Sequence, residues 1–586
     1  MAPPLPVGRY TADQYVTDTG ASGLTGAMNT FSGSGSGARL ILAPGQTYSA
    51  DFTKLNGGPS FLTIEGSAPG DGSASEGAVV EITNVNPANT SPLQYITFRR
   101  ITFTAPPTSL AGTYWLNGSD NLHIMFEDCD FIDFSPSIIL NSGDDIRFYR
   151  CRITQSSSPP SQMNPNILGP GGLLIIKDCL VDWNVNGAHT TSPNLNVALV
   201  GFAGYSNPSP GPWWIENNQI LPSGQWSADA AIDIEPPGTT FAHCWIVRNV
   251  IRDSKICLVT GDNVWVCGNT HIIDTNYPTT GPTETSFIVG QSPATTYPPL
   301  GEIHIEDNTI LDLNTSGSPN WSARKIDLLR DGYVRALYLN RNQFYYSSLP
   351  SGGSPLGVIQ CVITTNNTNT TGWGILSICD NVFGCVDSSG SVLLPAIHIH
   401  GVSGSRFDRV IIRGNRGIGA GPLSGVLPAT VAGGYTYLLD LGDSPLTTVV
   451  NDLTVEDNDL GASVSTSVSA WLDQHGTNTI TRNQWIKNFP REPKDTVNVN
   501  ANAFMYTHGA TSLVSLMLPS TGPAVVILSG GTNVTSITLN GITIFSQASA
   551  PIPQPVLFTA AIGDVVVVNN TVTRPTMNVV PYTSTF

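Results

Sequence analysis

The stretch "IHIEDNTI", residues 303–310, combines a short alternating strand with a tight corner. Apolar residues alternate with His304 and Glu306, as expected for a strand that is buried on one face. Asn308 follows. Asparagine tolerates the left-handed backbone region, and its amide can bond to a matching Asn one coil away. The stretch therefore predicts a strand, a corner, and the start of a second strand.

The same pattern returns about a dozen times, for example as "WWIENNQI" (213–220) and "LYLNRNQF" (337–344). The position of Asn308 is always Asn or Cys: Cys129, Cys151, Cys179, Asn218, Asn249, Asn269, Asn308, Asn342, Asn381, Asn415, Asn458 and Asn483. The spacing varies from about 20 to about 43 residues, and the excess lies in loops rich in Gly, Pro, Ser and Thr. Short strands repeated with Asn corners predict a solenoid.

This Asn ladder makes the sequence similar to right-handed parallel β-helices of the pectate-lyase-like family. The resemblance implies an all-β solenoid, which we expect over residues 36–490. The three early Cys residues depart from Asn, and we expect them to stack as buried thiols rather than disulfides. Residues 1–35 resemble the entry to many β-helices, and a helix at 22–31 is expected to cap the open end of the solenoid.

The Asn pattern stops after residue 490. Residues 491–586 contain alternating strands such as "PAVVILSGG" and "VTSITLNGITIF", which predict a C-terminal antiparallel β-sandwich. This segment resembles small C-terminal β modules of bacteriophage tail and capsid-decoration proteins.

Composition excludes several classes of partner. The net charge is −17 and only 12% of residues are charged, which argues against nucleic acid and anionic membranes. No apolar run is long enough for a membrane span, and the N-terminus lacks an apolar secretion signal. The nine cysteines show no paired metal-type spacing, so no metal is expected, and no phosphate loop or dinucleotide motif predicts a cofactor.

Counting back four from each ladder residue gives a column of outward positions that is unusually aromatic. Its members include Trp214, Trp245, Trp265, His304 and Tyr338. Exposed apolar patches usually mark a partner. Three interpretations stay open: a contact between copies in a homotrimer, a platform for sugar rings, or a face covered by the chain's own loops.

A second outward column gathers acids and histidines. "AIDIEP" places Asp233 and Glu235 on one face of a strand, and the equivalent strands carry Asp327, His398 and Asp440. Paired carboxylates can hydrolyse glycosides, so these five residues are the candidate catalytic groups. Asp233 and Asp327 are expected about 14 Å apart, whereas His398 and Asp440 should lie one coil apart.

Lys325 would lie near enough to neutralise an acidic sugar. The competing interpretation is that outward positions on a solenoid are simply polar.

These features predict a bacteriophage virion spike of the tailspike type. The spike would be made in the host cytoplasm, assembled as a homotrimer with other virion proteins, and would bind host surface polysaccharide. Cleavage of that glycan, as a hydrolase or lyase, stays open. The alternatives are a non-enzymatic structural or capsid-decoration spike, and a free polysaccharide lyase or hydrolase. Fold does not decide between them.

Overall fold

The structure, a computed structural model, divides into two compact units, residues 1–354 with 359–361 and residues 355–358 with 362–586. It describes residues 10–20, 22–31, 37–55, 60–66, 77–84, 93–105, 114–115, 122–134, 137–139, 144–154, 167–168, 172–182, 199–201, 212–221, 231–234, 242–258, 261–273, 286–291, 300–313, 325–330, 333–346, 358–363, 372–385, 396–401, 405–418, 439–441, 448–458, 472–474, 479–486, 495–498, 502–507, 524–560, 564–570 and 575–581. These residues are almost all in strands, apart from one α-helix, α1 (Gly23–Asn29), and one 3-10 turn, η1 (Phe52–Lys54). None of their helices could span a membrane.

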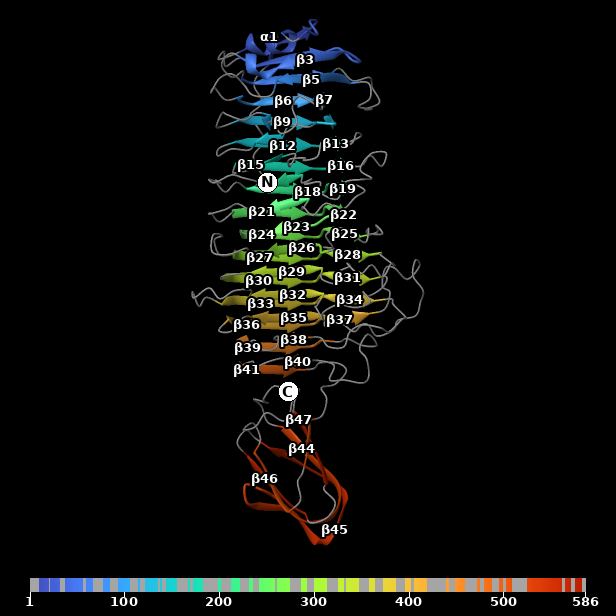
Figure 1. The fold of residues 1–586 in the computed structure, drawn as a ribbon, viewed down its shortest axis with the longest axis vertical. Coiled ribbons are helices and arrows are strands. Elements are labelled where there is room, and N and C mark those ends of the chain that lie inside the picture. The colour runs from blue at the N-terminus through green and yellow to red at the C-terminus, as the bar shows by residue number, and fades with distance from the viewer. Residues whose placement is uncertain are drawn as a thin grey trace. The chain divides into compact units, whose positions relative to one another are not determined.

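In the first unit the strands stack coil by coil into three parallel sheets (Figure 1). The first sheet runs β1 (Tyr10–Val16), β2 (Gly37–Leu42), β4 (Leu62–Gly66), β6 (Ile96–Arg99), β9 (His123–Glu127), β12 (Asp145–Tyr149), β15 (Leu173–Lys177), β18 (Trp213–Glu216), β21 (Ala242–Val247), β24 (Asp262–Cys267), β27 (Leu300–Glu306) and β30 (Val334–Asn340). The second runs β3 (Thr47–Asp51), β5 (Ala78–Asn84), β7 (Ile101–Thr104), β10 (Asp130–Ile132), β13 (Arg152–Thr154), β16 (Leu180–Asp182), β19 (Gln219–Leu221), β22 (Val250–Arg252), β25 (Thr270–Ile273), β28 (Thr309–Asp312) and β31 (Gln343–Tyr346). The third runs β8 (Tyr114–Trp115), β11 (Ser137–Ile139), β14 (Ile167–Leu168), β17 (Val200–Gly201), β20 (Ile232–Ile234), β23 (Ile256–Leu258), β26 (Ile288–Gln291) and β29 (Ile326–Arg330). Strand β32 (Ile359–Ile363) of this sheet is shared between the units.

The second unit repeats the same three-sheet coil and then changes architecture. Its first-sheet strands are β33 (Trp373–Cys379), β36 (Ser405–Arg413), β39 (Thr448–Glu456) and β41 (Thr479–Ile486). Its second-sheet strands are β34 (Val382–Cys385) and β37 (Arg416–Ile418), and its third-sheet strands are β35 (Ile397–Gly401), β38 (Leu439–Leu441) and β40 (Leu472–Gln474). Parallel pairing of each strand with its equivalent one coil away confirms the predicted all-β fold, a parallel β-helix.

The interior of the solenoid is packed with stacked apolar side chains. Phe98, Phe126 and Phe148 come from successive coils of the first sheet, with ring centroids 5.3 Å and 4.9 Å apart. All three are buried. Because equivalent inward positions repeat at the strand spacing of about 4.8 Å, identical rings stack face to face. The same periodicity that fills the core also forms columns on the outer face.

The Asn ladder is the main polar feature of the interior. The Oδ1 of Asn308 accepts hydrogen bonds from the backbone N of Asn269 at 2.9 Å and from its Nδ2 at 3.0 Å. The Nδ2 of Asn308 donates to the Val266 carbonyl and to Asn342 Oδ1. Asn308 is fully buried. The predicted bonding between matching asparagines is therefore confirmed. Each side chain also bonds to backbone N–H and C=O groups that the corner would otherwise leave buried without a hydrogen-bond partner.

The left-handed residue of each corner is the one before the ladder position, with φ of +58° at Asp307 and +55° at Asn217. The other corners of this type are Asp128, Arg150, Asp178, Arg248, Gly268, Arg341, Asp380, Gly414 and Asp457. Asn308 itself is not among the described residues with positive φ. Backbone tolerance was therefore the wrong reason for Asn at the ladder position, where the side chain's two-sided hydrogen bonding is what matters.

Two further predictions concern the ends of the ladder. The thiol of Cys179 accepts from the backbone N of Cys151 at 3.3 Å, and Cys151 and Cys179 are buried and free, as expected. Asn483 was wrongly assigned to the ladder, because it lies within β41 opposite Leu453. In "TITRNQWI" the strand continues through Asn483 to Ile486.

The last strands of the second unit are antiparallel, as predicted. They are β42 (Asp495–Asn498), β43 (Asn502–Thr507), β44 (Ala524–Leu539), β45 (Ile542–Ala560), β46 (Val565–Asn570) and β47 (Pro575–Pro581). Strand β44 changes partner near Gly530, pairing with β47 before it and with β46 after it. Strands that switch partner in this way form the corners of sandwiches. Both halves of β44 contribute side chains to one buried apolar cluster, which includes Val526, Leu528 and Ile537.

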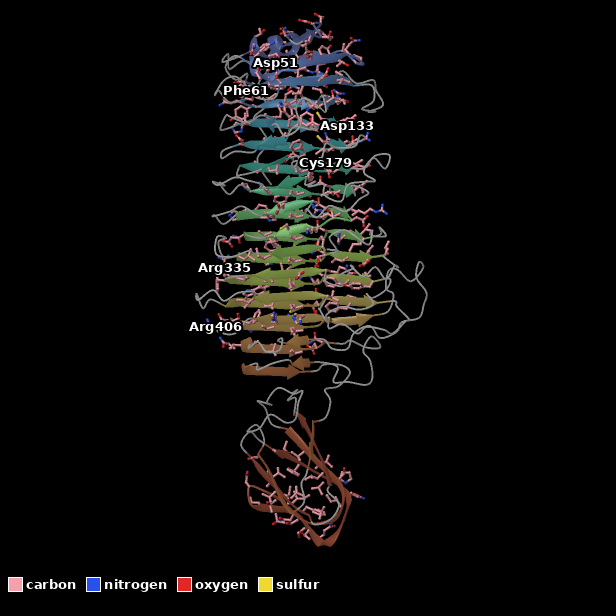
Figure 2. The ribbon with its side chains drawn as sticks, in the orientation of Figure 1. Asp51, Phe61, Asp133, Cys179, Arg335 and Arg406 are labelled. Carbon is pink, nitrogen blue, oxygen red and sulfur yellow. The ribbon has the colours of Figure 1, made fainter. Side chains whose placement is uncertain are left out.

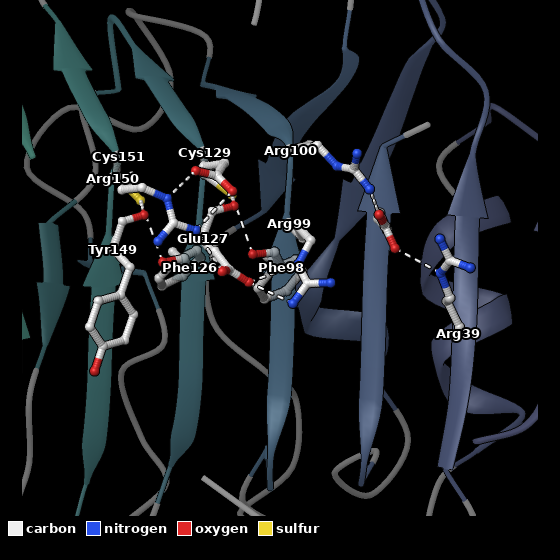
Figure 3. Close-up of polar contacts among 12 residues, drawn as sticks. Arg39, Phe98, Arg99, Arg100, Phe126, Glu127, Cys129, Tyr149, Arg150 and Cys151 are labelled. Atoms are coloured by element: carbon white, nitrogen blue, oxygen red, sulfur yellow. Dashed lines mark hydrogen bonds and ion pairs between the residues drawn. The ribbon is translucent and has the colours of Figure 1, made fainter. Parts of the chain in front are cut away.

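Ion pairs join neighbouring coils where strands of the first sheet end (Figure 3). Glu65 binds both Arg39 and Arg100, and Glu127 binds both Arg99 and Arg150. The arginines are between about a third and a half exposed. Exposed ion pairs each contribute about 0–1 kcal/mol to stability. These pairs therefore link side chains of neighbouring coils but add little to the free energy of folding.

A buried histidine should make the first unit acid-labile. His271 is 1% exposed, and its Nε2 donates to the Ser254 carbonyl at 2.6 Å. Burial, helped by the charge of Lys325, lowers the pKa of His271 to about 3. Its unfolded pKa is about 6.5, so the unfolded chain binds the extra proton first. Stability is therefore present above about pH 6.5 and falls as the pH drops toward 3, by up to about 1.4 kcal/mol per pH unit.

His271→Gln keeps a donor for Ser254 but cannot be protonated. We expect the variant to lose less stability than the wild type between pH 6.5 and 4, measured as urea midpoints at each pH. Equal pH dependence in the two proteins would contradict the assignment.

Candidate functional site

The aromatic column lies on the outer face of the first sheet, and strand register places all five residues in line. Trp214 pairs with Trp245, Trp245 with Trp265, Trp265 with His304, and His304 with Tyr338. Each therefore occupies the same outward position on five consecutive coils. His304 is 8% exposed and the other four are half-buried. The predicted geometry of this column follows directly from the ladder spacing.

Three rings of the column, Trp265, His304 and Tyr338, stack on one another along the solenoid. Trp265 and His304 have centroids 3.6 Å apart and planes 4° apart, and His304 and Tyr338 have centroids 4.7 Å apart and planes 16° apart. Trp214 and Trp245 are 5.0 Å apart with planes tilted by 31°. In the Trp265–His304–Tyr338 stack, ring faces are thus turned toward neighbouring coils, and ring edges turn outward. A sugar cannot stack on a face that another ring already covers, so contacts at this column would be made by ring edges and by the groups beside them.

Polar side chains line both sides of the column. His304 lies between two carboxylates, with Nε2 2.9 Å from Glu302 Oε1 and Nδ1 3.2 Å from Glu306 Oε1. Arg335, labelled in Figure 2, lies 2.6 Å from Asp262 and 3.9 Å from Glu302. The side chains of Glu302 and Arg335 are 38% and 49% exposed. Carboxylate and guanidinium groups therefore lie beside the aromatic column, where they could bind the hydroxyl groups of a ligand.

Glu216 binds the first tryptophan of the column, Trp214. Trp214 Nε1 donates to Glu216 Oε2 at 2.6 Å, and Lys177 and Arg248 also bind this carboxylate. Burial alone would raise the pKa of Glu216, but the hydrogen bond from Trp214 and the two positive charges hold it below its usual value. The carboxylate is therefore ionised at neutral pH and fixes the Trp214 ring.

The second candidate column lies on the third sheet. Asp233 is aligned through Cys257 and Val289 with Asp327, three coils away. In the second unit, His398 pairs with Asp440, and Asp440 with Asp473. The predicted one-coil spacing of His398 and Asp440 therefore agrees with the strand register. Glu235 lies outside the described residues.

Burial and distance limit what this second column can do. Asp327 is 4% exposed and His398 is 6% exposed, whereas Asp233 is half-buried. Three coils place Asp233 and Asp327 about 14 Å apart, beyond the roughly 5–9.5 Å of glycosidase carboxylate pairs. These two aspartates do not form a catalytic pair across one glycosidic bond.

The prediction for Lys325 was wrong. Its side chain is fully buried and its Nζ lies 2.7 Å from Asp312 Oδ2, which is also fully buried. Lys325 directly precedes strand β29, and its side chain faces inward. It cannot reach a ligand on the outer face. It therefore neutralises an internal acid and not a sugar.

Three functional candidates on the first sheet were missed from the sequence. Glu302 and Glu306 lie two positions either side of His304, so strand alternation could have placed them on the outer face. Arg335 is harder to place, because its contact with Asp262 joins residues 73 apart in sequence.

No protein-family model matches the chain, and no curated protein sequence does. Among solved structures, the chain is similar to a tailspike protein variant of E. coli bacteriophage HK620 in complex with a pentasaccharide. The identity is 11%, the TM-score is 0.38, and the match covers 95% of this chain and 89% of that one. A second variant of that tailspike, also with pentasaccharide, is 12% identical with a TM-score of 0.30, over 98% of this chain and 86% of that one. Likeness at this level carries no argument about a site or a ligand.

Proposed function

We propose that this chain is a bacteriophage virion spike of the tailspike type, and that it binds host surface polysaccharide along the outer face of the first sheet. The observation that carries the proposal is the aromatic column. Five aromatic residues repeat on five consecutive coils, with Glu302 and Arg335 exposed beside them. Aromatic rings with a few fixed polar groups are typical of ligand sites.

A polymer with its own repeat fits this face better than a small molecule. The coils of Trp265, His304 and Tyr338 present ring edges, because the faces of these rings are stacked on each other. One such contact is weak. Equivalent positions recur every 4.8 Å or so, and a polysaccharide can occupy several at once, so that weak contacts add along the chain.

Cleavage is not needed for this proposal. Asp233 and Asp327 on the third sheet lie three coils apart, too far for a glycosidase pair, and Asp327 and His398 are buried. Among the candidates whose burial the structure describes, Asp233 is the one that a substrate could most readily reach, and its predicted partner Glu235 follows it by two residues. Whether Asp233 cleaves the glycan, by hydrolysis or by a lyase reaction, is therefore tested separately in the same experiment.

We also propose assembly into a homotrimer and attachment to other virion proteins, which would place the spike on the released particle. The alternative of a structural or capsid-decoration spike is favoured by one feature of the column. Stacked rings with outward edges also suit packing against another protein surface. The experiment below separates the two.

The test is binding of purified protein to a panel of host capsule and lipopolysaccharide glycans, measured by biolayer interferometry. We expect the wild type to bind its host's glycan and Trp265→Ala to weaken binding about tenfold, since removal of an aromatic side chain that contributes to an interface typically costs more than about 1 kcal/mol, and about 1.4 kcal/mol is tenfold in affinity. Release of new reducing ends is followed in the same samples, with Asp233→Asn as the variant that would abolish it.

The matched control is Tyr95→Ala. Tyr95 is also a half-buried ring that precedes a first-sheet strand, and it stacks on Phe61 and His123 at 5.0 Å and 4.7 Å. Equal losses in both variants would indicate general damage to the sheet. No binding to any glycan from the host would favour a structural spike, and loss in Asp233→Asn alone would move the site to the third sheet.

A further inference from the structure

His304 is held on four sides within the aromatic column. On its own strand, β27, Nε2 lies 2.9 Å from Glu302 Oε1 and Nδ1 lies 3.2 Å from Glu306 Oε1. From the neighbouring coils it is faced by the indole of Trp265 on β24 and the phenol of Tyr338 on β30, with ring centroids 3.6 Å and 4.7 Å away. His304 is 8% exposed. The ring therefore has little freedom to turn, and both of its nitrogens face carboxylates.

This geometry determines how many protons the cluster needs. A neutral imidazole has one N–H donor and one acceptor nitrogen, whereas an ionised carboxylate only accepts. A neutral His304 could therefore bond to one glutamate, while its other nitrogen would present a lone pair to the second carboxylate. One added proton makes both nitrogens donors, and hydrogen bonds between charged partners are stronger than neutral ones. The arrangement of Glu302, His304 and Glu306 thus matches the imidazolium form.

The two stacked rings favour the same form. Their planes lie 4° and 16° from the plane of His304, so Trp265 and Tyr338 both turn their faces toward the imidazole. The face of an aromatic ring is the negative end of its quadrupole and attracts a cation placed over it. A charge on His304 therefore strengthens its contacts on all four sides, and loss of that charge weakens them together.

The two glutamates are not held equally. Glu306 has a side chain that is 12% exposed, and it also binds Arg341 at 2.6 Å. The side chain of Glu302 is 38% exposed, and Arg335 lies 3.9 Å away from it. When His304 loses its proton, Glu302 is therefore the carboxylate that can move away. It is also the carboxylate that lies exposed beside the column.

Other charged and titratable groups nearby do not replace this proton. Asp262 on β24 and Asp307 at the corner each bind an arginine, at 2.6 Å and 2.8 Å. Burial, helped by the charge of a neighbouring glutamate, raises the pKa of the Cys267 thiol to about 12, so this thiol is neutral. His304 is the only histidine of β24, β27 and β30. It is thus the group of these three strands that can change charge near neutral pH.

We propose that His304 is a positioning residue of the glycan site: as an imidazolium it holds Glu302 and the ring stack in place, and tight binding of the polysaccharide requires its proton. The inference rests on the glycan binding proposed above and specifies what controls it. A neutral His304 releases Glu302 and loosens its contacts with Trp265 and Tyr338, so that binding weakens as the pH rises.

The test is the pH profile of binding to the host glycan, measured by biolayer interferometry between about pH 5.5 and 9, a range that spans the usual titration of histidine. We expect the affinity of the wild type to fall about tenfold from the acidic to the basic end, the scale of one lost hydrogen bond between charged groups. His304→Gln keeps an N–H donor but cannot take up a proton. It should bind as weakly as the wild type does at the basic end, with no such pH dependence.

His243→Gln is the matched control. His243 lies on the same sheet with its ring 6.0 Å from that of Trp245, but it is exposed, and in the described part of the chain its ring nitrogens contact no carboxylate. This variant should keep the wild-type pH profile. Glu302→Gln is a second test variant at an exposed position. Its amide can donate to a neutral His304, so the pH dependence of binding should shrink.

Each outcome separates this inference from the proposed function. If His304→Gln weakens binding equally at every pH, or if wild-type binding does not change with pH, the inference is overturned while glycan binding stands. If the wild type binds no host glycan at any pH, the proposed function fails and the inference fails with it. If His304→Gln does not fold, Glu302→Gln decides: a reduced pH dependence supports the role of His304, and a wild-type profile overturns it.

Discussion

Asp312→Asn should lower the free energy of unfolding of the coils around it by about 3–5 kcal/mol, because it leaves the Lys325 ammonium buried without its counter-charge. Both side chains are fully buried, and Nζ to Oδ2 is 2.7 Å. The Lys325 Nζ also lies 5.4 Å from the centre of the Tyr346 ring. Burial lowers the pKa of Lys325, although Asp312 opposes the shift. When Asp312 is neutral, burial of the charged Lys325 ammonium costs more free energy.

Native-state hydrogen exchange at the amides of β28 and β29 is the measurement, because a solenoid can open locally. A loss of 3–5 kcal/mol corresponds to exchange about a hundred- to several-thousand-fold faster. The control replaces both partners, as Asp312→Leu with Lys325→Met. Removing a buried pair together is often neutral or stabilising. If Asp312→Asn costs as little as the double replacement, the pair does not hold these coils.

The strand register of the first sheet was predictable from sequence, and the reason is physical. Asn308 bonds to Asn269 on one side and to Asn342 on the other, so each ladder residue fixes its coil relative to the next. A count of four residues back from the ladder then places His304 and its equivalents correctly. The prediction failed at Asn483, where alternation continues past an Asn that belongs to the strand.

Burial on the outer face was not predictable in the same way. Asp327 and His398 occupy outward positions, as alternation predicts, yet they are 4% and 6% exposed. Alternation gives the direction of a side chain but says nothing of what else covers it. The Lys325–Asp312 pair escaped prediction for a related reason: neither residue belongs to the repeat, and their contact depends on where two strands of different sheets begin and end.

Asn249→Ala should be the other strongly destabilising substitution. The side chain makes four hydrogen bonds. Its Oδ1 accepts from the backbone N and Nδ2 of Asn218, both at 2.9 Å, and its Nδ2 donates to the Ile215 carbonyl at 2.9 Å and to Asn269 Oδ1 at 3.0 Å. Asn249 is 1% exposed. Truncation leaves the backbone N of Asn218 buried without an acceptor, and each unsatisfied group costs about 1–3 kcal/mol. We expect a total loss of about 3–5 kcal/mol.

The chain supplies its own control in the three early coils, where the ladder is built from cysteine. The Cys179 Sγ accepts from the backbone N of Cys151 at 3.3 Å, as an Asn Oδ1 does elsewhere. Asn249→Cys should therefore keep a weak acceptor for Asn218 and cost about half as much as alanine. Hydrogen exchange at the amides of β18, β21 and β24 measures both variants. If Asn249→Cys and Asn249→Ala are equally destabilised, the ladder stabilises by filling volume rather than by bonding, and the explanation given for its Asn residues fails.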